Sequence, residues 1–276
     1  MTDHWLSPSQ INTFLECQRK WGWRYLDGIR PPPNPAAQEG IAGHAIIERY
    51  LTTAAIDMTE PLAERAAGGL HHYPPPCTPG MQVEEHFGLR IGSYNFHGYK
   101  DVQLLRSACF SCGGTGTIGG NWVRDMSDCR DCNGTGSIPQ IWDHKFTANL
   151  RWAKSLETLQ TDTQVVIYAL DAMLRSGIPK CRCNWIYYQR RGAKKVESRQ
   201  LVVNGLGLID PLKGIVKTAG DITTARVHYT TATQLPPSVD SCSDYGGCVF
   251  QDRCGLTTQE IWQATLRSNA AKEAFA

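Results

Sequence analysis

Asp143 and Lys145 lie two residues apart in the short apolar stretch 140–147. Because side chains at i and i+2 of a β-strand point to the same face, this spacing predicts a carboxylate beside an ammonium group. A carboxylate can hold a hard divalent cation, and a neighbouring lysine can orient or deprotonate a water molecule. The pair indicates hydrolytic chemistry only if further ligands surround it, since Asp-x-Lys occurs by chance in many chains.

Three other places in the chain carry side chains suited to such a site. Gly40 and His44 are four residues apart and share a helix face, from which the histidine can bind a metal. Asp101 is a lone acid in a strand-like run, and Gln164 and Tyr168 share a second helix face. Taken singly, each also has a purely structural explanation: a core or surface histidine, an aspartate at a strand end, and a core tyrosine beside a solvated glutamine.

Eleven cysteines are many for 276 residues, and in a reducing compartment they are more often metal ligands than disulfide partners. The motif Cys-x-x-Cys-x-Gly-x-Gly occurs twice, at 109–116 and 129–136. Each Cys-x-x-Cys forms a tight knuckle, and the glycines allow the positive φ behind it. The motifs predict a Zn²⁺ site in an insertion that resembles the zinc module of DnaJ-type cochaperones. Its ligands, the knuckle cysteines, would be Cys109, Cys112, Cys129 and Cys132.

A second set, the terminal cysteines, consists of Cys242, Cys248 and Cys254 with Cys17 as a distant fourth member. Four thiolates suit a [4Fe–4S] cluster, and they also suit zinc. Spacing alone does not separate the two. Either metal centre would tie the N-terminal helix to the C-terminal segment and restrict the unfolded chain.

Composition supports an ordinary folded protein and limits how it could bind nucleic acid. Hydrophobic residues make up 41% of the chain, charged residues 20%, and the formal net charge is only +2. Contacts with DNA must therefore come from local patches. The candidates for such contacts are Arg19, Lys20, Arg190, Arg191, Lys194 and Lys195. No apolar run is long enough to span a membrane, and the first residues lack the form of a signal peptide, which predicts a cytoplasmic protein.

The apolar pattern predicts the elements that would position these residues. Helices are expected at 7–27, 39–53, 155–176, 210–225 and 257–276. Strands are expected at 83–91 and 94–105, joined as a hairpin, and at 141–146, 183–189 and 196–203. The segment 108–138 is rich in glycine and cysteine and interrupts two strands. This order predicts an α/β domain with a mixed sheet.

The order of the motifs along the chain indicates a protein family, which no single motif does. Gly-x3-His at 40–44, Gly-x2-Asp at 98–101, Asp-x-Lys at 143–145 and Gln-x3-Tyr at 164–168 resemble the RecB-like branch of the PD-(D/E)xK nuclease superfamily. Residues 6–21 also resemble the opening of Cas4-type and AddB-type nucleases. One departure is that the usual Asp-Tyr-Lys-Thr becomes Asp-His-Lys-Phe-Thr, which leaves Thr147 one position late.

This resemblance implies a metal site and a catalytic lysine. His44, Asp101 and Asp143 would bind Mg²⁺ or Mn²⁺, with the backbone carbonyl of His144 as a further ligand. Lys145 would position the attacking water.

Other residues would assist the site or stabilise the fold. Gln164 and Tyr168 would contact DNA phosphates or order the lysine. Glu84 or Glu85 would either support the site or form a solvated strand edge. The terminal cysteines would hold the iron–sulfur staple found in this branch.

As a whole, the resemblance implies a restriction-endonuclease-like central mixed sheet flanked by helices. The nuclease core would comprise 1–107 and 139–235, the zinc module 108–138, the iron–sulfur segment 236–256 and a C-terminal helix 257–276. The implied function is a metal-dependent DNA exonuclease on single-stranded ends in recombination or repair, as in a phage system, working in the host cytoplasm with a helicase or recombination partner. The alternative is a non-catalytic protein whose metal sites scaffold nucleic-acid or partner binding.

Overall fold

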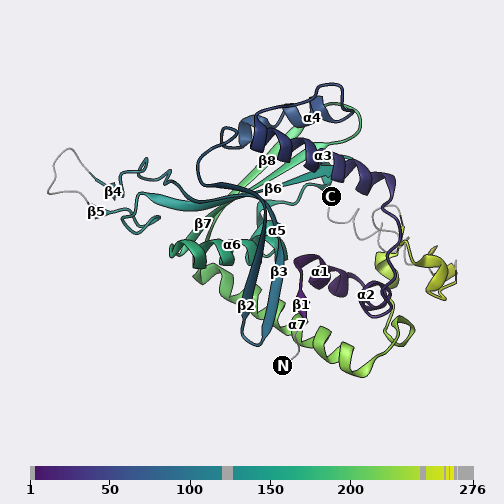
Figure 1. Cartoon of the computed structure of the whole chain (residues 1–276). Coiled ribbons are helices and arrows are strands. Elements are labelled where there is room, and N and C mark those ends of the chain that lie inside the picture. Colours follow the sequence, from purple (N-terminus) through teal and green to yellow (C-terminus); the bar gives the residue numbers. More distant parts are fainter. Residues whose placement is uncertain are drawn as a thin grey trace. The chain divides into compact units, whose positions relative to one another are not determined.

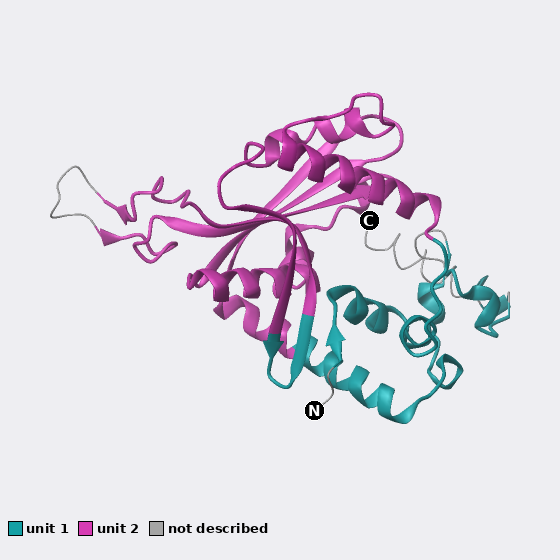
Figure 2. Ribbon diagram, viewed as in Figure 1, with its two compact units in different colours: residues 1–32, 90–96, 214–276 teal, residues 33–89, 97–213 magenta. Residues whose placement is uncertain are grey.

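The structure, a computed structural model, describes residues 4–119, 127–242 and 247–257 and the single positions 259, 260, 262, 263 and 266. It divides into two compact units (Figure 2). The terminal unit comprises residues 1–32, 90–96 and 214–276, and the sheet unit comprises residues 33–89 and 97–213. The candidate catalytic residues and the knuckle cysteines belong to the sheet unit, whereas the terminal cysteines belong to the terminal unit.

The sheet unit is built on a mixed sheet (Figure 1). Its strands are β2 (Met81–Ile91), β3 (Tyr94–Ala108), β6 (Ser137–Thr147), β7 (Lys180–Gln189) and β8 (Val196–Asn204). Strand β6 lies between β3, to which it is antiparallel, and β7, to which it is parallel; β8 is antiparallel to β7. Strands β2 and β3 form the predicted hairpin, whose tip belongs to the terminal unit, where β1 (Trp5–Leu6) pairs in parallel with the start of β3.

Helices cover both faces of this sheet (Figure 1). On one face, α3 (Pro35–Thr53) and α4 (Ala63–Ala67) bury Ile46, Ile47 and Leu51 against Trp142 and other apolar side chains of the strands. On the other face, α6 (Thr163–Ser176) packs against β6 and β7, with the short α5 (Leu156–Gln160) before it. The predicted α/β fold with a central mixed sheet flanked by helices is confirmed.

Two predicted helices are each divided in two. The helix expected at 7–27 is α1 (Pro8–Glu16) followed by α2 (Gln18–Tyr25), because Cys17 has an extended backbone and its sulfur accepts the Lys20 N–H. The helix expected at 155–176 is α5 and α6, because the Asp162 carboxylate accepts the N–H groups of Gln164 and Val165 and so starts a new helix. In both places a side chain accepts backbone N–H groups and caps a new helix, so the predicted helix is interrupted.

The terminal unit is mostly helical, and short elements lie between the main helices and strands of the chain. The terminal unit contains α1, α2, most of α7 (Ile209–His228) and a small core formed by Trp23, Ala232 and Phe250. The short elements are η1 (Leu70–His72), β4 (Thr117–Ile118), β5 (Ser127–Asp128), η3 (Leu150–Trp152), η4 (Leu206–Leu208), η5 (Ala232–Gln234), η6 (Val239–Ser241) and η8 (Gln251–Arg253). The predicted helix at 257–276 lies mostly outside the described residues. Within the described part of the chain, no helix has both the length and the apolar character needed to cross a membrane.

A buried ion pair fixes α6 to β3. Lys100 is fully buried, its ammonium pairs with Asp171 of α6, and it donates to Gln103 Oε1 at 2.9 Å. Burial lowers the pKa of Lys100, against the charge of Asp171. Separating or removing one partner of such a pair leaves an uncompensated buried charge. The pair therefore favours the placement of α6 that keeps Lys100 and Asp171 in contact.

We therefore expect Asp171→Asn to lower the free energy of unfolding by about 3–5 kcal/mol, measured by urea denaturation. The double variant Lys100→Met/Asp171→Leu should recover most of this loss, because it removes both charges. The control Asp210→Asn breaks the exposed pair with Lys213 and should change stability little. Unchanged stability of Asp171→Asn would show that the pair is not needed.

Candidate functional site

The candidate active site lies where β3 and β6 stop pairing. Their antiparallel ladder runs from Ala108–Ser137 to Val102–Trp142, with a shift in register between Leu104 and Ser107. Asp101 and Asp143 are the next residues beyond it. The backbone N–H of His144 donates instead to the Asp101 carboxylate, Oδ2, at 2.8 Å. A buried side chain thus replaces the next backbone acceptor.

Two imidazoles surround the Asp101 carboxylate. His44 Nδ1, from α3, lies 3.8 Å from Asp101 Oδ1, and His144 Nδ1 lies 3.3 Å from Asp101 Oδ2. The two imidazole rings are 4.0 Å apart between centroids. The ligand atoms of these three residues all lie within 4.8 Å of one another, which suits a metal ion. The structure therefore brings His44 and Asp101 together, and adds the His144 side chain, whereas the sequence motifs imply only the His144 carbonyl as a ligand.

Asp143 and Lys145 form the predicted carboxylate–ammonium pair. Lys145 Nζ lies 2.6 Å from Asp143 Oδ2, and the two carboxylate oxygens of Asp143 accept no hydrogen bond of good geometry in the described structure. Asp143 is buried, whereas the Lys145 side chain is 36% exposed. Asp143 is outside the group formed by His44, Asp101 and His144. A buried carboxylate that faces a single lysine ammonium is suited to a second cation.

The electrostatics of the site follow from burial and close opposite charges. Burial raises the pKa of the Asp143 carboxyl to about 7. Burial acts to lower the pKa of Lys145, but the carboxylates of Asp143 and Asp101 outweigh it and raise this pKa above its usual value. Burial opposes ionisation of Asp101, yet His144, His44 and Lys145 hold its pKa below the usual value. Lys145 is therefore a cation in this arrangement and can orient water or offset negative charge.

The two imidazoles differ in their surroundings. Burial lowers the pKa of His144 to about 3, so its ring is neutral. Burial also acts to lower the pKa of His44, but contact with Glu84 and the charge of Asp101 raise it above the usual value. A neutral imidazole is the form that binds a metal.

Gln164 and Tyr168 lie together on α6, as predicted. Gln164 Nε2 donates to the Tyr168 hydroxyl at 3.2 Å. Tyr168 is buried and packs edge-on against Phe87, and burial raises its pKa. The Phe87 ring also explains Gly98, because a Cβ there would stand 2.9 Å from that ring. The charges of Asp143 and Lys145 act on the Tyr168 hydroxyl, so α6 contributes to the same site.

Of the two glutamates considered for support, Glu84 lies at the site and Glu85 does not. Glu84 Oε1 lies 3.9 Å from His44 Nδ1, and Glu84 has the left-handed φ of +51°. Glu85 Oε1 instead lies 3.4 Å from Arg175 Nη2. A positive φ in a strand is uncommon for a residue other than glycine and turns the side chain out of the regular alternation. Nothing in the sequence signals this turn.

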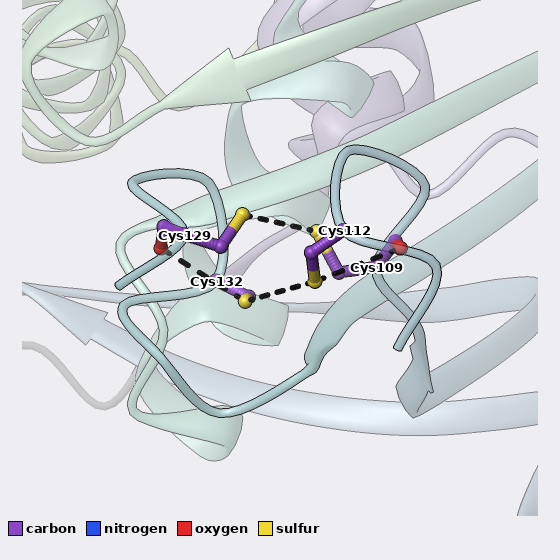
Figure 3. A group of neighbouring side chains, drawn as sticks. All are labelled: Cys109, Cys112, Cys129 and Cys132. Atoms are coloured by element: carbon purple, nitrogen blue, oxygen red, sulfur yellow. Dashed lines mark hydrogen bonds between the residues drawn. The ribbon is translucent and has the colours of Figure 1, made fainter. Parts of the chain in front are cut away.

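The knuckle cysteines form one compact cluster (Figure 3). Their four sulfurs turn toward one another from two loops, with Sγ–Sγ distances of 3.8 Å for Cys109–Cys129 and for Cys112–Cys132. A four-cysteine cluster of this kind could bind zinc or an iron–sulfur centre. In the described residues of the insertion, burial involves the cysteines and Ile138 and little else. The cluster is thus the core of the insertion.

Glycines allow the two loops to pack as matching halves. Cys109 N–H donates to the carbonyl of Gly136 at 2.9 Å, and Cys129 N–H donates to that of Gly116 at 2.8 Å. A Cβ on Gly116 would stand 2.3 Å from the oxygen of Gly134, and one on Gly136 would stand 2.3 Å from that of Gly114. Both glycines also have positive φ. Each Gly-x-Gly is therefore required by backbone contact with the other loop.

The terminal cysteines line a common pocket in the terminal unit. Cys17, Cys242, Cys248 and Cys254 all border it. The Cys17 sulfur accepts the N–H groups of Lys20 at 3.4 Å and Ser238 at 3.3 Å. Burial raises the pKa of Cys242 to about 11, and the other three sulfurs act in the same direction. Four thiols that border one pocket are suited to a shared metal centre.

Most of the basic candidates for DNA contact are engaged within the protein. Arg19 donates to the carbonyls of Leu235 and Cys254, both at 2.8 Å. Lys20, Arg190 and Lys194 pair with glutamates. These four side chains therefore have partners within the protein, and Arg191 and Lys195 are the other two candidates.

A close glycine contact positions the helix that carries His44. A Cβ on Gly43 would stand 2.4 Å from the Phe146 ring of β6, which is itself stacked on Tyr188 at 4.7 Å. Gly40, one turn earlier on the same helix, has no atom within 4 Å of its Cβ position. Gly43 and not Gly40 is therefore the glycine that meets the strand.

We expect Gly43→Ala to destabilise the sheet unit by about 1–3 kcal/mol, because α3 must move away from β6. Gly40→Ala is the matched control, and it should stabilise the helix by about 0.5–1 kcal/mol. Thermal and urea unfolding of the two variants measure the contrast. Equal effects of the two substitutions would contradict the close contact.

One comparison with known proteins agrees with the first of the sequence motifs. Residues 5–73, which include His44, match the family model of the PD-(D/E)XK nuclease superfamily. No curated protein sequence matches the chain. A solved structure described as "Putative exonuclease" from Eubacterium rectale has 11% identity and a TM-score of 0.48, with 91% of this chain and 86% of that chain covered. The structure of SSO0001 has 12% identity and a TM-score of 0.40, with 93% and 90% covered.

Similarity of structure at this level supports no inference about activity. The match to the family model is independent of it and falls on the segment that holds the first metal-ligand motif. The resemblance predicted from the motifs is thereby confirmed: over residues 5–73, this chain is similar to the PD-(D/E)XK nuclease superfamily.

Proposed function

We propose that this protein is a metal-dependent DNA nuclease of the RecB-like and Cas4-type branch, acting as an exonuclease on single-stranded ends. The observation that carries the proposal is the Asp143–Lys145 pair beside Asp101 at the end of the β3–β6 ladder. Hydrolysis of a phosphodiester requires charge neutralisation, an oriented water and a fixed geometry, and this arrangement offers groups suited to each.

The donor set fits a divalent cation. Asp143 is buried with the Lys145 ammonium 2.6 Å from its Oδ2, and Asp101 and His44 present an oxygen and a nitrogen 3.8 Å apart. We propose His44, Asp101 and Asp143 as ligands of Mg²⁺ or Mn²⁺, with the carbonyl of His144 as a further ligand. When bound, such an ion supplies positive charge to the phosphate oxygens and to the attacking water.

Lys145 and the α6 pair complete the proposed machinery. The Lys145 ammonium is anchored at Asp143, while part of its side chain remains exposed, so it can orient a water molecule at the scissile phosphate. The Tyr168 hydroxyl, oriented by Gln164, contributes to the polar surroundings of the lysine.

An exposed tryptophan supports a single-stranded substrate. Trp152 follows the catalytic strand by a few residues and is 54% exposed, although η3 holds its backbone in place. The Arg151 guanidinium lies 4.8 Å from the Trp152 ring centroid. Aromatic rings that stack on unpaired bases, next to cations that meet phosphates, are typical of single-strand binding. With a net charge of only +2, such a local contact would contribute more to DNA binding than the electrostatic field of the whole protein.

The separations of the sulfurs support different metals for the two cysteine sets. Four thiolates about 2.3 Å from one zinc ion lie roughly 3.8 Å apart, which equals the Cys109–Cys129 and Cys112–Cys132 distances. Among the described residues, the terminal cysteines do not form a group within 4.8 Å, so they are too widely spaced for one ion as they stand. We therefore propose zinc for the knuckle cysteines and a [4Fe–4S] cluster, with zinc as its rival, for the terminal cysteines.

The resemblance supports the biological setting that we propose. This setting is recombination or repair in the cytoplasm, in a phage or similar system, with a helicase or recombination protein as partner. The remaining basic side chains, Arg191 and Lys195, are proposed to meet the DNA backbone.

For the nuclease proposal, we expect the metal-loaded protein to degrade end-labelled single-stranded DNA in the presence of Mn²⁺. Lys145→Met and Asp143→Asn should each lower kcat by a factor of roughly 10²–10⁴, because each removes a charge needed in the transition state. Gel analysis of single-stranded, double-stranded and circular substrates measures the rates and separates end-dependent from internal cleavage.

The matched control is Lys213→Met, which removes an exposed lysine outside the site and should leave the rate unchanged. Cleavage by both Lys145→Met and Asp143→Asn at the wild-type rate would refute the site assignment. A wild-type protein that binds DNA without cutting it would favour the non-catalytic alternative.

For the cysteine sites, we expect one zinc and four irons per chain, measured by elemental analysis together with acid-labile sulfide. Gly136→Ala should remove the zinc and spare the iron, because its Cβ would strike Gly114. Cys248→Ser should remove the iron and spare the zinc, so each variant controls for the other. Two zinc ions and no iron would overturn the cluster assignment.

A further inference from the structure

The His144 side chain is a buried imidazole without a hydrogen-bond partner. It lies between Asp143 and Lys145 in β6 and is 1% exposed. Within the described structure, neither Nδ1 nor Nε2 makes a hydrogen bond. Buried polar atoms are satisfied in the great majority of native structures, and each exception calls for an explanation such as an ion.

The atoms nearest this imidazole are those of the proposed metal site. His144 Nδ1 lies 3.3 Å from Asp101 Oδ2, and the ring is 4.0 Å from that of His44. A bond from Nδ1–H to Asp101 would be the ordinary solution, but that contact does not have hydrogen-bonding geometry, and Asp101 Oδ2 already accepts the His144 amide at 2.8 Å. The ring nitrogens therefore face a carboxylate and an imidazole without donating to either.

These separations fit direct coordination. Two ligands about 2.1 Å from one ion lie roughly 3.0 Å apart in octahedral geometry and roughly 3.4 Å apart in tetrahedral geometry. The observed contacts are 3.3 Å from His144 Nδ1 to Asp101 Oδ2 and 3.8 Å from His44 Nδ1 to Asp101 Oδ1. One ligand atom from each of the three residues lies within 4.8 Å of the other two. The His44 side chain is 31% exposed, which leaves that side of the group open to water and to phosphate.

We propose that the His144 imidazole is itself a ligand of the divalent ion, beside His44 and Asp101, and that the second nitrogen makes the site select Mn²⁺ over Mg²⁺. This inference rests on the proposed nuclease function for the role of the ion. Mg²⁺ favours oxygen ligands in near-ideal octahedral geometry, whereas imidazole suits later divalent metals and Mn²⁺ also accepts carboxylate and water. Two imidazoles among the carboxylate ligands thus favour Mn²⁺ over Mg²⁺.

The metal-binding test uses the zinc- and cluster-containing protein without DNA. Calorimetric titration should give a higher affinity for Mn²⁺ than for Mg²⁺. His144→Phe should weaken Mn²⁺ binding by roughly tenfold or more and Mg²⁺ binding far less, because it removes only a nitrogen ligand. His71→Phe is the matched control, since His71 is exposed and outside the group, and it should bind both ions as the wild type does.

A spectroscopic measurement on the wild type avoids any dependence on the folding of a variant. Electron spin echo modulation of bound Mn²⁺ detects directly coordinated imidazole nitrogens, and we expect two of them, falling to one in His144→Phe. A single nitrogen in the wild type, or a His144→Phe affinity for Mn²⁺ within twofold of the wild type, would overturn the proposal.

The outcomes also separate this inference from the proposed function. A single coordinated nitrogen together with Lys145-dependent cleavage would refute the ligand role of His144 and leave the nuclease standing. Two coordinated nitrogens in a protein that cuts no DNA would support the metal site and refute the nuclease.

Discussion

The hydrogen bond from the His144 amide to the Asp101 carboxylate is the contact on which the candidate site depends. Backbone pairing between β3 and β6 ends at Val102–Trp142, so the His144 amide of β6 needs another acceptor. Asp101 supplies it and is thereby held at a fixed distance from β6. On the other side of β3, the neighbouring Lys100 is bound to Asp171 of α6. Two adjacent residues of one strand therefore anchor the site, one to β6 and one to α6.

Because strand side chains alternate, a site in the middle of a ladder could draw on only one face of the sheet. Here β6 contributes Asp143 and Lys145 to the side of α6, and His144 to the side of α3. Side chains from both faces of β6 can approach Asp101 because β3 and β6 no longer pair at this point. Helix α3 can bring His44 close only because Gly43 lets it touch the ring of Phe146. The chemistry is thus set by where the pairing stops as much as by which residues are present.

The sequence predicts the parts of this arrangement that depend on local pattern. The hairpin, the central strand with Asp143 and Lys145, and the Gly-rich cysteine loops all have short-range signals that do not need the rest of the fold. The breaks at Cys17 and Asp162 were missed because a cap competes with a continuous apolar stripe. The left-handed Glu84, the contact at Gly43 and the inward position of His144 were missed for another reason. Each depends on a neighbour that is distant in sequence. For His144, strand alternation places the side chain on the face opposite to Asp143 and Lys145, and therefore gives no indication that it belongs to the site.

The knuckle cysteines lie at the other end of the β3–β6 ladder. Cys109 directly follows β3, and Cys132 stands a few residues before β6, so their sulfur cluster holds the outer ends of both strands. The ladder between them contains a shift in register at Leu104–Ser107 and does not by itself exclude slippage. A slip of one residue would exchange the faces of Asp143 and His144. A cluster at one end and the Asp101 contact at the other resist that slip together, since a displaced β6 would have to break both.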